Sequence, residues 1–228
     1  LDLQCSTETI YGHLTLRVPG THNFPINPWG LRYDEVTASN LVEIDIDGNA
    51  VGSSNYPVNK AGFVIHSAIH AGRKDLHCVF HIHTTDGMAV AAQQDGLLPI
   101  SIMATGYYGR IAYHDYEGPS LNLEERERLV LSMGDHKNLI LRNHGLLTAG
   151  TTVEEAFILM FRLQRACEIQ IAAQSGGNAL TIPPNDVCEE SARLTDEFLE
   201  GNDGAPAGVL EFESYVRLID KLDPSYKH

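Results

Sequence analysis

Two histidines separated by a single residue lie in an apolar segment, CVFHIHTTDGMAV. The segment predicts a buried strand over residues 78–83. Alternate side chains of a strand share a face, so we expect His81 and His83 on one face and Phe80 and Ile82 on the other. Burying two neutral imidazoles costs free energy unless another group uses their lone pairs. A divalent metal ion would accept those lone pairs, so the segment is a candidate metal site. The alternative interpretation is that both residues are core histidines held by hydrogen bonds.

A third candidate ligand is His144, in the segment RNHGL. It follows an apolar strand, and Gly145 after it lets the chain turn sharply and leaves the ring uncrowded. Two histidines from a strand and one from a turn leave a coordination position open, as in catalytic zinc sites. A closed structural site would take a fourth protein ligand, usually cysteine, and no cysteine cluster lies nearby. By spacing alone, the metal site and the pair of core histidines are equally compatible with the sequence.

Strands and helices alternate along the chain and must position these residues. The patterns predict strands at 14–18, 78–83 and 111–116, a proline-rich loop at 23–30, a hairpin at 41–51, a strand–turn–strand at 139–150, and helices at 61–73, 86–94, 122–134 and 152–177. Two amphipathic helices follow a polar linker at 178–186. We expect an α/β fold, a three-layer α/β/α sandwich around a mixed, largely antiparallel sheet. Residues 1–177 would form its metal-binding domain and 178–228 a C-terminal helical extension of it.

Composition excludes several classes of function. The chain has 228 residues, 43% of them hydrophobic, and a formal net charge of −14. Such an acidic chain repels phosphates, so we expect neither nucleic acid nor anionic membrane as a partner. No apolar run approaches the roughly 20 residues that cross a bilayer, and the N-terminus lacks the pattern of a signal peptide. The four widely spaced cysteines indicate a reduced, cytoplasmic protein.

Several ordered blocks of the sequence closely resemble one known family. The blocks are INPWGLRYDEVTASNLVEID at 26–45, PVNKAGFVIHSAIHAGR at 57–73, CVFHIHT at 78–84, LLPIS at 97–101, IAYHDYEG at 111–118 and LILRNHGLLTAGTTVEEAF at 139–157. Together they resemble the class II aldolase/adducin family, and specifically its adducin-like branch, over about residues 12–175. This set of blocks is far more specific than a lone pair of histidines.

The resemblance implies a metal site and a class of reaction. His81, His83 and His144 match the family's metal histidines, which hold one divalent ion per chain, usually zinc and sometimes manganese or iron(II). In the lyases the metal is a Lewis acid that stabilises the enediolate left when a carbon–carbon bond breaks. The same electron sink would stabilise the carbanion left by loss of carbon dioxide. The resemblance also implies a homotetramer with active sites at subunit interfaces.

The sequence departs from the sugar-phosphate enzymes just before the short helix at 61–73. The aldolases carry a Ser-Ser-Glu run there, in which the serines hold phosphate and the glutamate acts as acid and base. Alignment on His66 places the glutamate at Gly62 and the serines at Lys60 and Ala61. The general base is therefore missing, as it is in adducin, which is considered non-catalytic. Adducin heads also lose metal histidines, whereas all three are present here.

Another residue would have to move protons in an active site without that glutamate. His66 and His70 lie one helical turn apart, and His66 is our candidate catalytic acid or base near neutral pH. A packing or hydrogen-bonding role is the alternative for such a helix histidine. The tyrosines of the segment at 107–116 are further candidates, which core packing also explains.

Four residues are candidates for binding substrate. Asn27 and Gly30 belong to the NPWG loop, which matches the place where the aldolases hold phosphate with backbone amides. Asn59 and Lys60 could offer an amide and an ammonium group to an anion. The alternative is that the loop residues build a turn and that Lys60 is solvated.

The sequence therefore favours a metal-dependent carbon–carbon lyase that acts on a small anionic hydroxy- or keto-acid through a metal-stabilised enolate. Decarboxylation is slightly favoured over aldol cleavage because the phosphate-binding serines are absent. One alternative is a non-catalytic, adducin-like interaction or structural module. A second is an iron-dependent oxygenase that uses the same three histidines.

Overall fold

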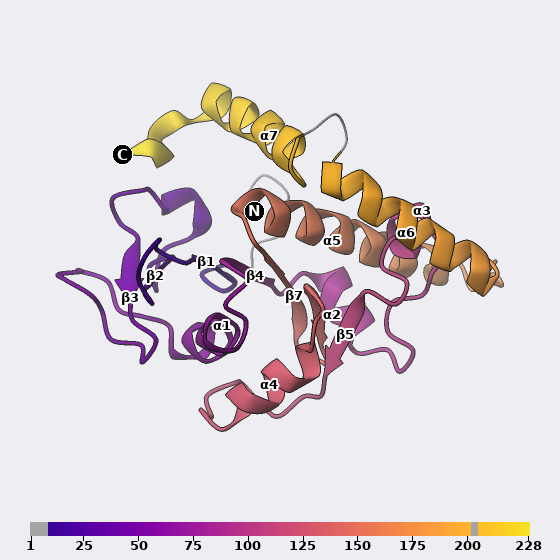
Figure 1. Cartoon of the computed structure of the whole chain (residues 1–228), viewed down its shortest axis with the longest axis horizontal. Helices are drawn as coiled ribbons and strands as arrows, with labels where there is room; N and C mark the ends of the chain where they lie inside the picture. The colour runs from indigo at the N-terminus through magenta and orange to yellow at the C-terminus, as the bar shows by residue number, and fades with distance from the viewer. Residues whose placement is uncertain (1–8, 202–204) are drawn as a thin grey trace.

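The computed structural model describes residues 9–201 and 205–228 and has three layers (Figure 1). Helices α1 (Lys60–Gly72) and α4 (Glu125–Met133) cover one face of a central sheet. Helix α5 (Val153–Ser175) covers the other face, together with α2 (Thr85–Ala91) and α3 (Ile102–Thr105). The predicted α/β/α sandwich is confirmed.

Seven strands of the described chain form one mixed sheet in the order β3-β2-β1-β4-β7-β6-β5. They are β1 His13–Leu16, β2 Phe24–Ile26, β3 Val42–Ile44, β4 Cys78–Ile82, β5 Ile111–His114, β6 Asn138–Leu141 and β7 Gly145–Gly150. Among these strands β5 and β6 pair in parallel and every other pair is antiparallel. The sheet is therefore largely antiparallel, as the sequence predicts.

Strand β4 lies at the centre of the sheet, and its side chains alternate between the two cores. Phe80 and Ile82 belong to the apolar cluster under α5, whereas Val79 belongs to the cluster under α1 and α4. This alternation confirms the expectation that His81 and Phe80 project from opposite faces.

Strand β2 lies within the segment that the prolines of the sequence marked as a loop. Proline lacks the N–H that a strand ladder uses, so a proline-containing run ordinarily favours a loop. Here Phe24 and Ile26, on either side of Pro25, are fully buried, and their burial holds the short strand between β1 and β3. The hairpin predicted at 41–51 is shorter than expected, because only β3 and an isolated bridge between Ile44 and Ala50 form.

The helices on either side of the β6–β7 hairpin, α4 and α5, differ at their N-termini. Thr152 caps α5, because its Oγ1 accepts a hydrogen bond from the N–H of Glu155. Helix α4 begins later than predicted, at Glu125. Asn122 lies before the helix, where its Oδ1 accepts a hydrogen bond from the N–H of Glu124.

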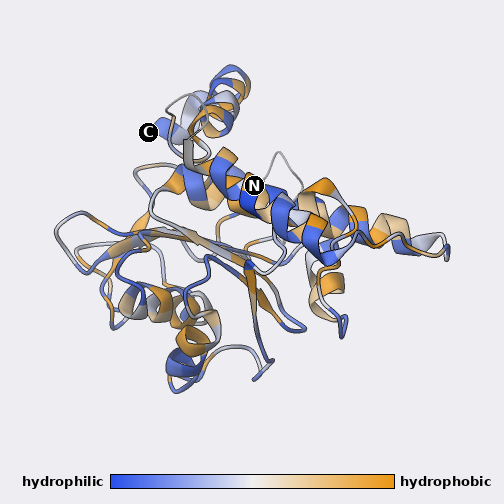
Figure 2. Cartoon of the chain, turned by 45° about the vertical axis from the view of Figure 1, so that its right-hand side comes forward, coloured by the Kyte–Doolittle hydropathy of each residue, from blue (hydrophilic) through white to orange (hydrophobic). Residues whose placement is uncertain are grey.

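Two helices close the chain, α6 (Asn185–Gly201) and α7 (Val209–Leu222). Helix α6 packs on α3, and α7 packs on α5. In Figure 2 the helices above the sheet carry both hydrophilic and hydrophobic stretches. Several of their apolar side chains are exposed, namely Val187, Leu194, Phe198, Leu210, Leu218 and Leu222. None of the helices in the described part of the chain is long and apolar enough to cross a membrane.

Candidate metal centre

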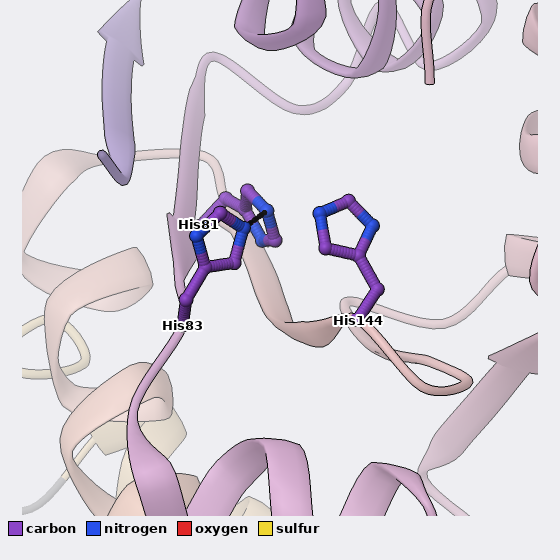
Figure 3. Close-up of side chains that lie close together, drawn as sticks. All are labelled: His81, His83 and His144. Carbon is purple, nitrogen blue, oxygen red and sulfur yellow. Dashed lines mark hydrogen bonds between the residues drawn. The ribbon is translucent and has the colours of Figure 1, made fainter. Parts of the chain in front are cut away.

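Three histidines converge at one end of β4 (Figure 3). His81 belongs to β4, His83 follows it directly, and His144 comes from the turn between β6 and β7. One ring nitrogen from each lies within 4.8 Å of the others. Tertiary structure therefore brings together the three residues that the sequence singled out as ligands.

The His81 ring is oriented by a buried carbonyl group. Its Nδ1 donates a hydrogen bond to the backbone oxygen of Leu146, at 2.8 Å. In the neutral ring this leaves the lone pair on Nε2, which lies 2.8 Å from Nε2 of His83. Metal-binding histidines commonly donate their second nitrogen in this way, which fixes the tautomer and the ring plane.

The protonation state of the site also suits a metal. Burial, followed by the neighbouring charges of His144 and His83, holds the pKa of His81 well below its usual value. Burial, followed by His83 and His114, lowers the pKa of His144 to about 4. Both imidazoles are therefore neutral at pH 7, the form that coordinates a metal. Three converging imidazoles are a ligand set that fits zinc, and also manganese or iron(II).

Gly145 is needed for close packing rather than for the turn. The residue with positive φ in this turn is Asn143, at 56°. A Cβ on Gly145 would lie 2.5 Å from the backbone oxygen of Ile82, and 3.1 and 3.3 Å from ring atoms of His83 and His81. The expectation of a sharp turn at Gly145 was wrong, but its missing side chain does leave the histidine rings uncrowded.

His66 lies beneath the metal site and not among its ligands. It is fully buried on α1, and its Nδ1 is 2.8 Å from Oγ1 of Thr15. The same hydroxyl lies 2.8 Å from Nε2 of His70, so Thr15 joins the two helix histidines. Burial, followed by His13 and His70, holds the pKa of His66 well below its usual value. A hydrogen-bonding role is thus evident, and a catalytic role for His66 stays a hypothesis.

Asn27 and Gly30 occupy different environments in the NPWG loop. Asn27 is buried, and its side chain bonds the backbone of β1: Nδ2 donates to the oxygen of Gly12 at 3.3 Å, and Oδ1 accepts from the N–H of Leu14 at 3.4 Å. Gly30 is exposed, with a φ of 104° that favours glycine. Its contribution in this structure is to the turn.

Asn59 and Lys60 mark the start of α1. Lys60 is the first helical residue and is exposed. Asn59 is half-buried, and its Nδ2 donates to Nε2 of His13 at 2.8 Å. Asn27 and Asn59 therefore share a neighbour, His13, that the sequence predictions left out.

His13 lies directly beside the metal site. It pairs with His81 across β1 and β4 and is only 3% exposed. Burial, followed by the charges of His83 and His144, lowers its pKa to about 4. The segment HLTL shows the same alternation as the histidines of β4, but the strand was predicted to start at Leu14. Starting the strand one residue earlier would have placed His13 and Thr15 on one face.

The fold and the three converging histidines together define an α/β protein with a candidate metal centre. A family model described as the class II aldolase and adducin N-terminal domain matches residues 2–171. The chain belongs to this family.

Individual relatives include both adducins and aldolases. Alpha-adducin of Rattus norvegicus is 44% identical over 97% of this chain, which spans 31% of that protein. The crystal structure of an aldolase II superfamily protein from Pseudomonas syringae is 48% identical, with a TM-score of 0.93 over 100% of this chain and 90% of the other. An L-fuculose 1-phosphate aldolase from Glaciozyma antarctica is 29% identical, with a TM-score of 0.84 over 100% of this chain and 87% of the other.

Proposed function

We propose that the protein is a metal-dependent carbon–carbon lyase, of the decarboxylase or aldolase type, for a small anionic hydroxy- or keto-acid. The observation that carries this proposal is the convergence of His81, His83 and His144, with one nitrogen from each within 4.8 Å. Similarity over the whole chain to an L-fuculose 1-phosphate aldolase supports the reaction class. The missing serine pair before α1 favours a carboxylate over a phosphate as the anionic group.

His81, His83 and His144 would hold the ion. When bound, the metal supplies Lewis acidity, which stabilises negative charge developing on a substrate oxygen. The backbone oxygen of Leu146 keeps the His81 ring in its binding orientation. Zinc is the ion we propose, with one per chain.

Substrate binding and proton transfer are assigned to neighbouring residues. Lys60 is exposed at the N-terminus of α1, where the helix dipole adds to its positive charge, so it is our candidate for attracting the carboxylate. The turn at Gly30 and the amides of Asn27 and Asn59 would shape the pocket. His66 is the candidate proton carrier, since its Nε2 is buried without a partner among the described residues.

A second candidate function is a non-catalytic, adducin-like interaction module. Two observations favour it: glycine stands at position 62, where the aldolases have their glutamate, and the chain is 44% identical to alpha-adducin. Such a module has no need of a stoichiometric metal in an open site.

Metal content separates the two candidates. Protein purified without added metal is analysed by plasma mass spectrometry, for wild type and for His83→Ala. About one zinc, manganese or iron per chain, lost in the variant, supports the lyase and justifies a screen of hydroxy- and keto-acids for release of carbon dioxide or aldehyde. No bound metal, and no change in melting temperature when metal is added, would favour the interaction module.

The proposal includes a cytoplasmic homotetramer. Exposed apolar side chains on α6 and α7, such as Phe198 and Leu222, support an association between subunits. Light scattering coupled to gel filtration measures the mass, and a monomeric mass near 25.1 kDa at micromolar concentration would contradict this part of the proposal.

A further inference from the structure

The side chain of His13 is the neighbour of His81 on the same face of the sheet. The two residues are paired across β1 and β4. Directly opposed residues of antiparallel strands have Cβ atoms about 5 Å apart and project to the same side. The His13 ring is therefore next to the metal site, although it is not one of the three converging ligands.

The hydrogen bond from Asn59 determines which nitrogen of His13 carries the proton. An amide NH₂ group can only donate, so Nε2 of His13, 2.8 Å away, must accept. A neutral ring then keeps its proton on Nδ1. That atom is buried and has no hydrogen-bond partner among the described residues. A buried donor without a partner is costly, which indicates that an acceptor from outside the chain completes it.

The surrounding structure holds the His13 ring in one place. Asn27 bonds the backbone on both sides of it, at Gly12 and Leu14. Gly62 packs on its face, because a Cβ there would lie 2.7 to 2.8 Å from three atoms of the ring. The glycine that replaces the aldolase glutamate thus makes room for an imidazole. Functional donors need fixed positions of this kind.

We propose that His13 contacts the substrate, and that its Nδ1–H donates a hydrogen bond to a carboxylate or carbonyl oxygen held beside His81. A neutral imidazole in this position stabilises negative charge on that oxygen without giving up its proton. Asn59 and Asn27 are positioning residues, since they set the tautomer and the place of the ring. This inference rests on the proposed function, because it needs a metal at the three histidines.

The test measures binding of a small dicarboxylate and needs no knowledge of the true substrate. Apo protein is loaded with cobalt(II), whose visible spectrum reports its ligands, and is titrated with oxalate. Two variants are compared. His13→Gln keeps a side-chain N–H donor, whereas His13→Met has a similar length but no N–H donor. His70→Ala is the control, because His70 is buried in the same group of histidines and is bonded to Thr15 away from the site.

We expect all four proteins to bind one cobalt ion. Oxalate affinity should fall about tenfold or more in His13→Met, as for loss of a hydrogen bond to a charged group, and by less than about threefold in His13→Gln and His70→Ala. Two outcomes would overturn the role of His13 and leave the metal site intact. One is equal oxalate affinity in His13→Met and wild type, and the other is no binding of oxalate by cobalt-loaded wild type. A wild type that binds no cobalt would instead overturn the proposed function. If His13→Met does not fold, His13→Phe keeps a ring over Gly62 and gives the same comparison.

Discussion

The two faces of β1 and β4 are built from different chemistry. The face toward α1 carries His13, Thr15 and His81, all buried. The face toward α5 carries Leu14 and Phe80. On the first face, side chains are held by directional hydrogen bonds, including the link from His66 through Thr15 to His70. On the second, they are held by shape and apolar contact.

This difference separates an apolar face that stabilises the fold from a polar face that holds the candidate metal site. The face toward α5 also borders a cavity of about 470 Å³, lined by aromatic side chains such as Phe157 and Tyr215. It offers contact area but few groups that can bind a metal. The face toward α1 buries polar groups at a cost and keeps them neutral, as a metal site requires. We therefore expect substitutions on the two faces to affect different measurements.

The largest effect is expected from a matched pair of substitutions in β4. His81→Ala removes a proposed ligand and should reduce bound metal from about one ion per chain to a trace, a larger loss than the roughly 10- to 100-fold cost of removing a hydrogen-bond partner of a ligand. Phe80→Ala should keep the metal but lower the free energy of unfolding by about 3 kcal/mol, because it opens a void. Metal analysis and urea unfolding measure the two effects. Metal loss in Phe80→Ala, with the fold intact, would contradict the division between the faces.

Gly145→Ala tests how tightly the site is packed against β4. The added Cβ would approach the oxygen of Ile82 to 2.5 Å, so the turn that carries His144 must shift. We expect a loss of about 2 kcal/mol of stability together with at least tenfold weaker metal binding. Gly176→Ala is the control, since its Cβ would meet only the flexible side chain of Asn178, at 3.2 Å. An unchanged metal affinity in Gly145→Ala would show that the turn adapts freely.

The histidines at and beside the candidate metal site should make the metal-free protein sensitive to acid. Burial lowers the pKa of His13 and of His144 from 6.5 to about 4. Between these values the unfolded chain binds more protons than the folded one, so stability is fully present above pH 6.5 and falls as the pH is lowered toward 4. At pH 5, each of these two histidines should lower the free energy of unfolding by about 2 kcal/mol relative to its value at neutral pH. Urea unfolding of the metal-free protein from pH 7.5 to 5 measures the loss.

The His13→Phe variant sharpens the acid experiment. It removes one titrating group and keeps a ring in place, so its stability should depend less steeply on pH than that of wild type. The same slope in both proteins would assign the acid sensitivity to the other histidines.

The smallest effect concerns the contact between His13 and Gly62. Gly62→Ala places a Cβ against the His13 ring and should destabilise the protein, whereas the same substitution in a His13→Ala background should cost less. We expect a coupling of about 1 kcal/mol in the double-mutant cycle, measured by urea unfolding. If the losses of stability from the two substitutions simply add, the His13 ring moves away from the new Cβ at no cost in free energy.

Local patterns in the sequence predicted much of the fold. Helices α1 and α5 follow from the spacing of their apolar residues, and β4 and the β6–β7 hairpin follow from their apolar runs. Strand β2 was missed because Pro25 argues for a loop, and only burial of Phe24 and Ile26 against neighbouring strands makes it a strand. Helix α4 was predicted to begin at residue 122, whereas it begins at Glu125.

The sequence by itself was enough to single out three candidate ligands, to place them on a strand and a turn, and to indicate the family. The period of two in a strand and the need of buried imidazoles for a partner are local properties, so they were enough to propose His81, His83 and His144 as metal ligands, with hydrogen-bonded core histidines as the alternative. Only the tertiary structure decided that His13 belongs beside them. That placement depends on the register between β1 and β4, on Asn59 from α1, and on the room left by Gly62. These contacts join residues far apart in the chain, and no local pattern specifies them.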